Sequence, residues 1–213
     1  VKELILRGEG DPSLSMAHII EMARELKAAG IRKVQSIGVD QSFFDNQYTP
    51  PAFEQQPNEW APFRAPVAAV SLNQNTIVFT VRPSEKGKAA ILSADPPGFA
   101  DMLGTVRTTG KGDPEKVTLS LNPSASRLSA AFGGSLPEKS RPLKIAKRID
   151  DPRVFAGYAL RSALKDIGIE IEGDVHITQK REKNLLASHR SARLAELINA
   201  LGKDSDNFYA EMI

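Results

Sequence analysis

The sequence predicts a mixed α/β protein with a small all-β subdomain in its middle. Strand-like alternation and amphipathic helical patterns follow one another at both ends of the 213-residue chain. Residues 84–142 differ from both ends, because Gly, Pro, Ser and Thr divide them into short alternating runs such as Val117-Thr118-Leu119-Ser120-Leu121. Short strands separated by turn residues are typical of small β domains.

The first forty residues predict a strand, a helix and a second strand. Residues 1–6 alternate like a strand, and Ser15 can cap a helix with one apolar face. Gly30 suits the C-terminal end of that helix, and residues 31–40 return as a strand. This order is that of a βαβ-like unit.

An irregular segment follows at residues 41–66. Prolines at positions 50, 51 and 57 exclude a regular helix or a central strand there. Irregular segments of this length inside a domain are often functional. Residues 67–81 then predict strands on either side of Asn73-Gln74-Asn75.

The C-terminal part alternates between helices and a strand. Residues 152–168 predict a helix, 169–178 a strand and 191–201 an amphipathic helix. Gly202-Lys203-Asp204 is expected to interrupt this last helix, and a new helix is expected to begin near Ser205.

Composition excludes several classes of function. The chain has no cysteine, so disulfides and thiolate chemistry are excluded. Its net charge is only +2 and aromatic residues make up 6%, which argues against nucleic-acid binding. No apolar run has the roughly 20 residues of a transmembrane helix. His18, His176 and His189 lack paired metal-ligand spacing, which argues against a metal site.

One short motif could carry chemistry. Ser205-Asp206-Asn207 combines a hydroxyl with a side-chain amide near the expected start of a helix. In acyl transfer from an amide, a hydroxyl can pass a proton to the leaving amine, and an amide can hold the substrate peptide. Taken alone, the triplet equally fits a helix N-cap.

Four further segments, in the same order, make this motif specific. They are residues 4–14 (LILRGEGDPSL), residues 63–73 (FRAPVAAVSLN), Asp151-Pro152 and residues 188–191 (SHRS). With Ser-x-Asn, this set resembles the low-molecular-mass class C penicillin-binding proteins, the D-Ala-D-Ala carboxypeptidases and endopeptidases of the penicillin-binding protein 4 type. The resemblance covers nearly the whole chain.

The resemblance implies three parts and a location outside the cytoplasm. Residues 1–83 and 143–182 would form a mixed α/β domain, and residues 84–142 a small β domain inserted into it. Residues 183–213 would be a helical piece of the penicillin-binding catalytic domain, whose fold is like that of serine β-lactamases. The family's partners are peptidoglycan stem peptides ending in D-Ala-D-Ala and β-lactam antibiotics.

The resemblance also assigns roles and shows what this chain lacks. Ser205 would relay a proton to the leaving amine, and Asn207 would bind the substrate amide. The family's nucleophilic Ser-x-x-Lys lies upstream of residue 4 and its Lys-Thr-Gly lies downstream of Ser-x-Asn, so we expect the chain alone to be an inactive internal piece. Ser162-Ala163-Leu164-Lys165 has Ser-x-x-Lys spacing but the wrong place in this order.

Substrate choice rests on three residues before the Phe-x-Ala-Pro segment or within it. In relatives that act on diaminopimelate peptides, an acidic residue meets the free amine of the side chain and an aromatic lines the pocket. Here Phe63 keeps the aromatic, Asn58 falls at the acidic position, and the neighbouring Glu59 could take over its role. The alternative for the whole chain is a non-catalytic cell-envelope binding or assembly module.

Overall fold

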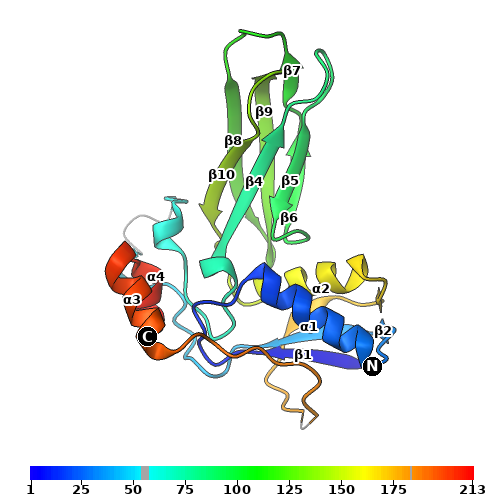
Figure 1. Ribbon diagram of the computed structural model, residues 1–213, viewed down its shortest axis with the longest axis vertical. Helices are drawn as coiled ribbons and strands as arrows, with labels where there is room; N and C mark the ends of the chain where they lie inside the picture. Colours follow the sequence, from blue (N-terminus) through cyan, green and yellow to red (C-terminus); the bar gives the residue numbers. More distant parts are fainter. Residues whose placement is uncertain (54–57, 183) are drawn as a thin grey trace. The chain divides into compact units, whose positions relative to one another are not determined.

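The computed structural model describes residues 1–53, 58–182 and 184–213 (Figure 1). Pro57 of the irregular segment and Lys183, the first residue of the expected C-terminal piece, lie outside these ranges. The chain divides into two compact units. Unit 1 contains Val1–Thr76 and Arg148–Ile213, and unit 2 contains Ile77–Lys147.

Unit 1 is built on a parallel sheet. Strand β3 (Ser36–Asp40) lies between β1 (Glu3–Arg7) and β12 (Val175–Ile177), and both neighbours run parallel to it. Four of the five β3 residues are buried, as expected for a central parallel strand. The sheet therefore brings the first strand of the chain together with a strand that follows unit 2 in the sequence.

Two helices pack against each other, and one of them also packs on this sheet. Helix α1 (Met16–Ala28) has Ser15 as its N-cap residue, and its buried face carries Ile19, Ala23 and Leu26, as the sequence predicted. Helix α2 (Phe155–Asp166) contacts α1 and the sheet. Its close approach depends on Gly157, because a Cβ there would lie 2.5 Å from Val175 and 2.6 Å from Val39.

Several expected boundaries are wrong. Residues 31–40 and 169–178 are each split, because β2 (Lys33–Val34) and β11 (Glu170–Ile171) pair with each other in a separate two-stranded sheet. Helix α2 begins at Phe155 instead of residue 152, since the Asp151 carboxylate accepts the Arg153 backbone N–H in a local turn. Alternation along a chain does not reveal which strands become partners.

Residues 67–72 are not a strand either. They are followed by a 3₁₀ turn, η3 (Asn73–Asn75), whose three residues have φ of 48°, 53° and 48°. The buried Asn75 side chain donates to Pro66 O at 2.8 Å and Ser71 Oγ at 2.9 Å. It thus satisfies polar groups that a strand would have paired with neighbours.

Unit 2, all of which the structure describes, contains strands only. Strand β4 (Thr76–Arg82) lies between β10 (Leu143–Arg148) and β5 (Ile91–Asp95). Strand β9 (Arg127–Pro137) pairs with β6 (Ala100–Gly104), β7 (Arg107–Thr109) and β8 (Lys116–Ser124). Phe79 and Phe132 meet edge to face with their ring centroids 5.6 Å apart in its core.

This unit is wider than the expected 84–142, because β4 and β10 pair with each other and extend it on both sides. Its status as an inserted domain stays a prediction. Within the described ranges, the chain has no helix with the length and apolar character to span a membrane.

The end of unit 1 consists of two helices. Helix α3 (Leu194–Asp204) begins three residues later than expected and runs through Gly202–Asp204, so the expected interruption there is wrong. Gly202 has open space around it, and a helix tolerates such a glycine at a cost of about 1 kcal/mol. Helix α3 ends at its C-cap residue Ser205 instead, and α4 (Asn207–Met212) follows.

Candidate active site

Ser205 lies at the corner between α3 and α4. Its backbone is left-handed, with φ 50° and ψ 46°, and the residue is exposed. Asp206, not Ser205, caps α4, because its Oδ1 accepts the backbone N–H groups of Phe208 (2.9 Å) and Tyr209 (3.2 Å). The N-cap interpretation therefore applies to Asp206, whereas Ser205 is the left-handed C-cap that ends α3.

One face of α4 is buried and the other is open. Phe208 and Met212 are buried in a small cluster with Ala65, and Phe44, Val67 and Tyr209 pack around it. Burial raises the pKa of Tyr209, and Asp206 and Asp11 raise it further. Asn207, at the first turn of α4, is exposed. The buried face thus fixes the helix while Ser205 and Asn207 both stay accessible.

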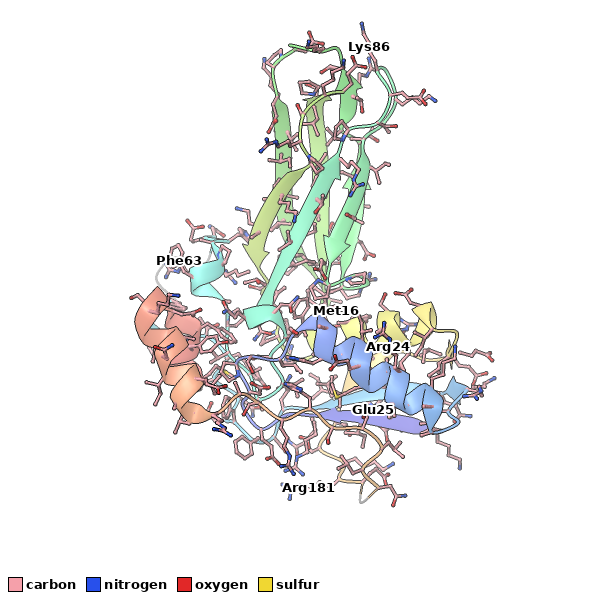
Figure 2. The ribbon with its side chains drawn as sticks, in the orientation of Figure 1. Met16, Arg24, Glu25, Phe63, Lys86 and Arg181 are labelled. Carbon is pink, nitrogen blue, oxygen red and sulfur yellow. The ribbon has the colours of Figure 1, made fainter. Side chains whose placement is uncertain are left out.

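The cluster places α4 beside the Phe-x-Ala-Pro segment. This segment contains the 3₁₀ turn η2 (Pro62–Arg64), which contacts α4. Ala65 is 2% exposed, whereas Phe63 is 60% exposed and lies on the outside of the turn (Figure 2). The Arg64 guanidinium donates to Phe53 O at 2.9 Å and lies over the Phe53 ring. An exposed aromatic side chain is therefore held on a turn that packs on the motif helix.

Asn58 and Glu59 precede this turn and are both exposed. The Glu59 Oε1 atom accepts the Ala61 backbone N–H at 2.9 Å. One carboxylate oxygen of Glu59 is thus engaged in a local turn. Five predicted site residues consequently lie in two segments that meet where η2 contacts α4: Ser205 and Asn207 at the helix corner, and Asn58, Glu59 and Phe63 before or on η2.

The segment Ser162–Lys165 has Ser-x-x-Lys spacing but the wrong place in the motif order, and its serine and lysine do not form a pair. Ser162 is half-buried and Lys165 exposed on α2, and no hydrogen bond joins the two side chains in the described part of the chain. Likewise, no group of three metal-ligating side chains occurs among the residues that the structure describes.

Sequence reasoning missed a pairing of two histidines. His18 and His189, whose positions in the sequence showed no pairing, stack with ring centroids 3.7 Å apart. His189 Nε2 lies 3.4 Å from Asp11 Oδ2, and His18 Nδ1 accepts the Ser15 backbone N–H at 3.2 Å. These contacts fasten the segment that leads into α3 to the beginning of α1. Only the shared membership of Asp11 and His189 in the ordered motif set could have suggested it.

A profile of the D-Ala-D-Ala carboxypeptidase 3 (S13) family matches residues 1–213. The chain belongs to this family. It is 27% identical over 231 residues to a D-alanyl-D-alanine carboxypeptidase of Actinomadura sp. (strain R39), covering 100% of this chain and 41% of that protein. It is 24% identical over 214 residues to D-alanyl-D-alanine carboxypeptidase DacB of Haemophilus influenzae, covering 99% of this chain and 44% of the relative.

The fold agrees with solved structures of this group. Penicillin binding protein 4 (dacB) from Haemophilus influenzae superposes with a TM-score of 0.70 at 24% identity, over 98% of this chain and 46% of that one. The same protein complexed with a novel β-lactam gives a TM-score of 0.61 at 23% identity, over 98% and 44%. The expected penicillin-binding protein 4 type and the mixed α/β fold class are confirmed. The S13 chain spans less than half the length of the relatives it matches.

Proposed function

We propose that this chain is the part of a serine-type D-Ala-D-Ala carboxypeptidase that supplies Ser205 and Asn207 to the reaction. The observation that supports this most is the left-handed, exposed Ser205 at the corner before α4. A non-glycine residue in this conformation stores strain, and such strain is concentrated at functional sites. Asp206 is the N-cap of α4 and Ser205 is the left-handed C-cap of α3, but neither role uses the Ser205 hydroxyl, so helix capping does not account for that group.

The proposed chemistry is acyl transfer. A serine outside this chain attacks the carbonyl carbon of the penultimate D-Ala, the terminal D-Ala leaves, and water hydrolyses the resulting ester. The attacking serine loses its proton, and the Ser205 hydroxyl takes up a proton as it passes its own to the departing amine, while the Asn207 side-chain amide hydrogen-bonds the substrate peptide. A β-lactam acylates the same serine. Endopeptidase action on cross-links is the same reaction with a larger leaving group.

The turn beside α4 is the proposed contact for the substrate side chain. Phe63 offers an exposed aromatic surface, and Glu59 offers the negative charge that Asn58 lacks. Because one Glu59 oxygen accepts the Ala61 N–H, an ammonium group would meet the other. A charge-assisted bond of this kind contributes about 1.5–3 kcal/mol when it is partly shielded from water.

This proposal includes the organisation and location expected from the sequence. The α/β domain comprises residues 1–76 and 148–182, the β domain inserted into it comprises residues 77–147 instead of the expected 84–142, and residues 183–213 enter the catalytic domain. Enzymes with peptidoglycan substrates act outside the cytoplasm, so the parent protein is placed there. The reaction requires no metal or organic cofactor.

The test is covalent labelling by a fluorescent penicillin. The 213-residue chain should give no labelled band after denaturation, because the attacking serine lies elsewhere, whereas the longer parent protein should label. In the parent, Ser205→Ala should slow acylation by roughly 10²-fold, the scale of a lost proton-transfer group, and Asn207→Ala should slow it as well. Ser162→Ala is the matched control and should leave labelling unchanged.

Two outcomes would contradict the proposal. Near-wild-type acylation in both motif variants would reduce Ser205 to a structural corner. A parent protein that does not label at all would favour the non-catalytic envelope module.

The substrate residues have a separate test in the parent. Cleavage of a stem peptide with a free side-chain amine is compared with cleavage of its acetylated form. Glu59→Gln should abolish a preference of at least about tenfold, which corresponds to about 1.4 kcal/mol. An unchanged ratio of kcat/KM values would remove Glu59 from the site.

A further inference from the structure

The segment 58–67 contains the proposed substrate residues Asn58, Glu59 and Phe63. Several contacts hold this segment in place at its C-terminal end. Ala65 belongs to the buried cluster under α4. The Asn75 amide donates to Pro66 O at 2.8 Å, and the Val67 N–H donates to Tyr48 O at 2.8 Å. These contacts fix residues 65–67 but do not reach Asn58 and Glu59, which need an anchor of their own.

Arg148 supplies that anchor. Its backbone N–H donates to Trp60 O at 3.0 Å, and its Nε donates to Glu59 O at 2.6 Å. Its guanidinium carbon lies 4.9 Å from the centroid of the Trp60 ring. Although charged, the residue is only 8% exposed. Three contacts from one buried arginine thus converge on two successive residues of the loop.

The cation is balanced on its other side. Arg148 Nη1 donates to Ile149 O at 3.2 Å and lies 3.4 Å from Asp150 Oδ1. The Ile149 N–H in turn donates to Asn75 O at 3.0 Å. Through this bond the arginine is tied to the same buried turn that holds Pro66. Both ends of the loop, residues 59–60 and residues 65–67, are therefore anchored to the same buried turn around Asn75.

We infer that Arg148 is a positioning residue that fixes the 58–63 loop and so sets the enzyme's preference for the substrate side chain. The inference rests on the proposed function. Arg148 acts through Glu59 and Trp60, whose carbonyl oxygens it holds. The contacts given above join it to the substrate loop and to residues 149 and 150. Its loss should therefore affect recognition of the substrate side chain more than the acyl-transfer step.

The guanidinium is required for this arrangement. A planar guanidinium can stack on an indole and donate a hydrogen bond in its own plane at the same time. A lysine ammonium keeps the charge and much of the apolar stem but cannot do both. Arg148→Lys thus separates loop positioning from charge, and it is the milder variant beside Arg148→Met.

The first test uses fluorescence of the 213-residue chain, in which Trp60 is the single tryptophan. Acrylamide should quench Trp60 fluorescence more strongly in both Arg148 variants than in wild type, because the guanidinium no longer shields the indole ring from solvent. Arg161→Lys is the matched control, since Arg161 is a partly exposed arginine that pairs with Asp174 at 3.6 Å and lies on α2. Unchanged quenching in both Arg148 variants would show that Arg148 does not order the loop.

The second test uses the parent enzyme. Arg148→Lys should raise KM for a stem peptide with a free side-chain amine by about tenfold, equivalent to about 1.4 kcal/mol of binding. Acylation by a penicillin that lacks this amine should stay within about threefold of wild type. The ratio between free and acetylated peptides should fall, as in Glu59→Gln.

Equal losses for peptide and penicillin would overturn the inference, because Arg148 would then support the fold as a whole. No loss for either ligand would overturn it too. If the wild-type parent does not react with penicillin, the proposed function fails, and the quenching comparison alone then decides whether Arg148 orders the loop.

Discussion

Replacing Ser205 with glycine should stabilise unit 1, whereas replacing it with alanine should not. The left-handed region costs a non-glycine residue about 1–2 kcal/mol. Glycine avoids this cost but loses about 0.5–1 kcal/mol more chain entropy than alanine on folding. Because Ser205 is exposed and its φ is 50°, the balance should leave Ser205→Gly more stable than Ser205→Ala by about 0.5–1 kcal/mol.

Urea unfolding followed by Trp60 fluorescence measures this difference, since Trp60 belongs to unit 1. With an m-value of about 1–3 kcal/mol per molar, the midpoints should differ by about 0.2–1 M. In the parent enzyme both variants should acylate slowly, because both lack the hydroxyl. An alanine variant as stable as the glycine variant would show that residue 205 is not strained, and the main support for the proposed function would be lost.

Three further predictions concern stability and pH. Asp206→Ala should destabilise α4 by about 1 kcal/mol in urea unfolding, and Asp206→Asn, which keeps an acceptor oxygen, should avoid most of that loss. Gly157→Ala should cost about 1–3 kcal/mol, because its Cβ would lie 2.5 Å and 2.6 Å from two valine methyl groups. Gly202→Ala, with nothing within 4 Å, should instead gain up to about 1 kcal/mol, and a reversed order of these two melting temperatures would contradict the packing of α2. The hydrogen bond from Lys180 lowers the pKa of Glu3, so the stability contributed by Glu3 is present above the ordinary glutamate pKa and is lost as pH falls through the lowered value. Glu3→Gln should therefore destabilise slightly, by less than about 1 kcal/mol, near neutral pH and not in acid, and an equal effect at both pH values would contradict the pairing.

Local patterns predicted those elements whose environment is set by their own sequence. The apolar face of α1 and the N-cap position of Ser15 are both confirmed. The strand at 36–40 lies within a predicted segment, and the strand at 3–7 overlaps the predicted 1–6 in all but Arg7, because strand-like alternation is a local pattern. The family was predicted from a set of motifs in a fixed order, and no single motif of that set would have predicted it.

Features that depend on distant partners were not predicted. Lys33–Val34 left the expected strand because it pairs with residues 170–171, and nothing in its own alternation indicates that partner. The stacking of His18 on His189 likewise requires two separate segments to meet. Ser205 was expected at the start of a helix, yet it ends one, because α3 continues to Asp204 and Asp206 takes the N-cap position of α4.

The order of strands in unit 1 has a consequence for synthesis on the ribosome. β3 pairs on one side with β1, which is made before it, and on the other with β12, which is made only after the whole of unit 2. At about 5–20 residues per second, this second edge stays open for roughly 7 to 27 seconds. An unpaired parallel edge invites association with other chains. Unit 2 is contiguous and can close its own sheets during that interval, so the nascent protein carries a finished β unit and an unfinished α/β unit together.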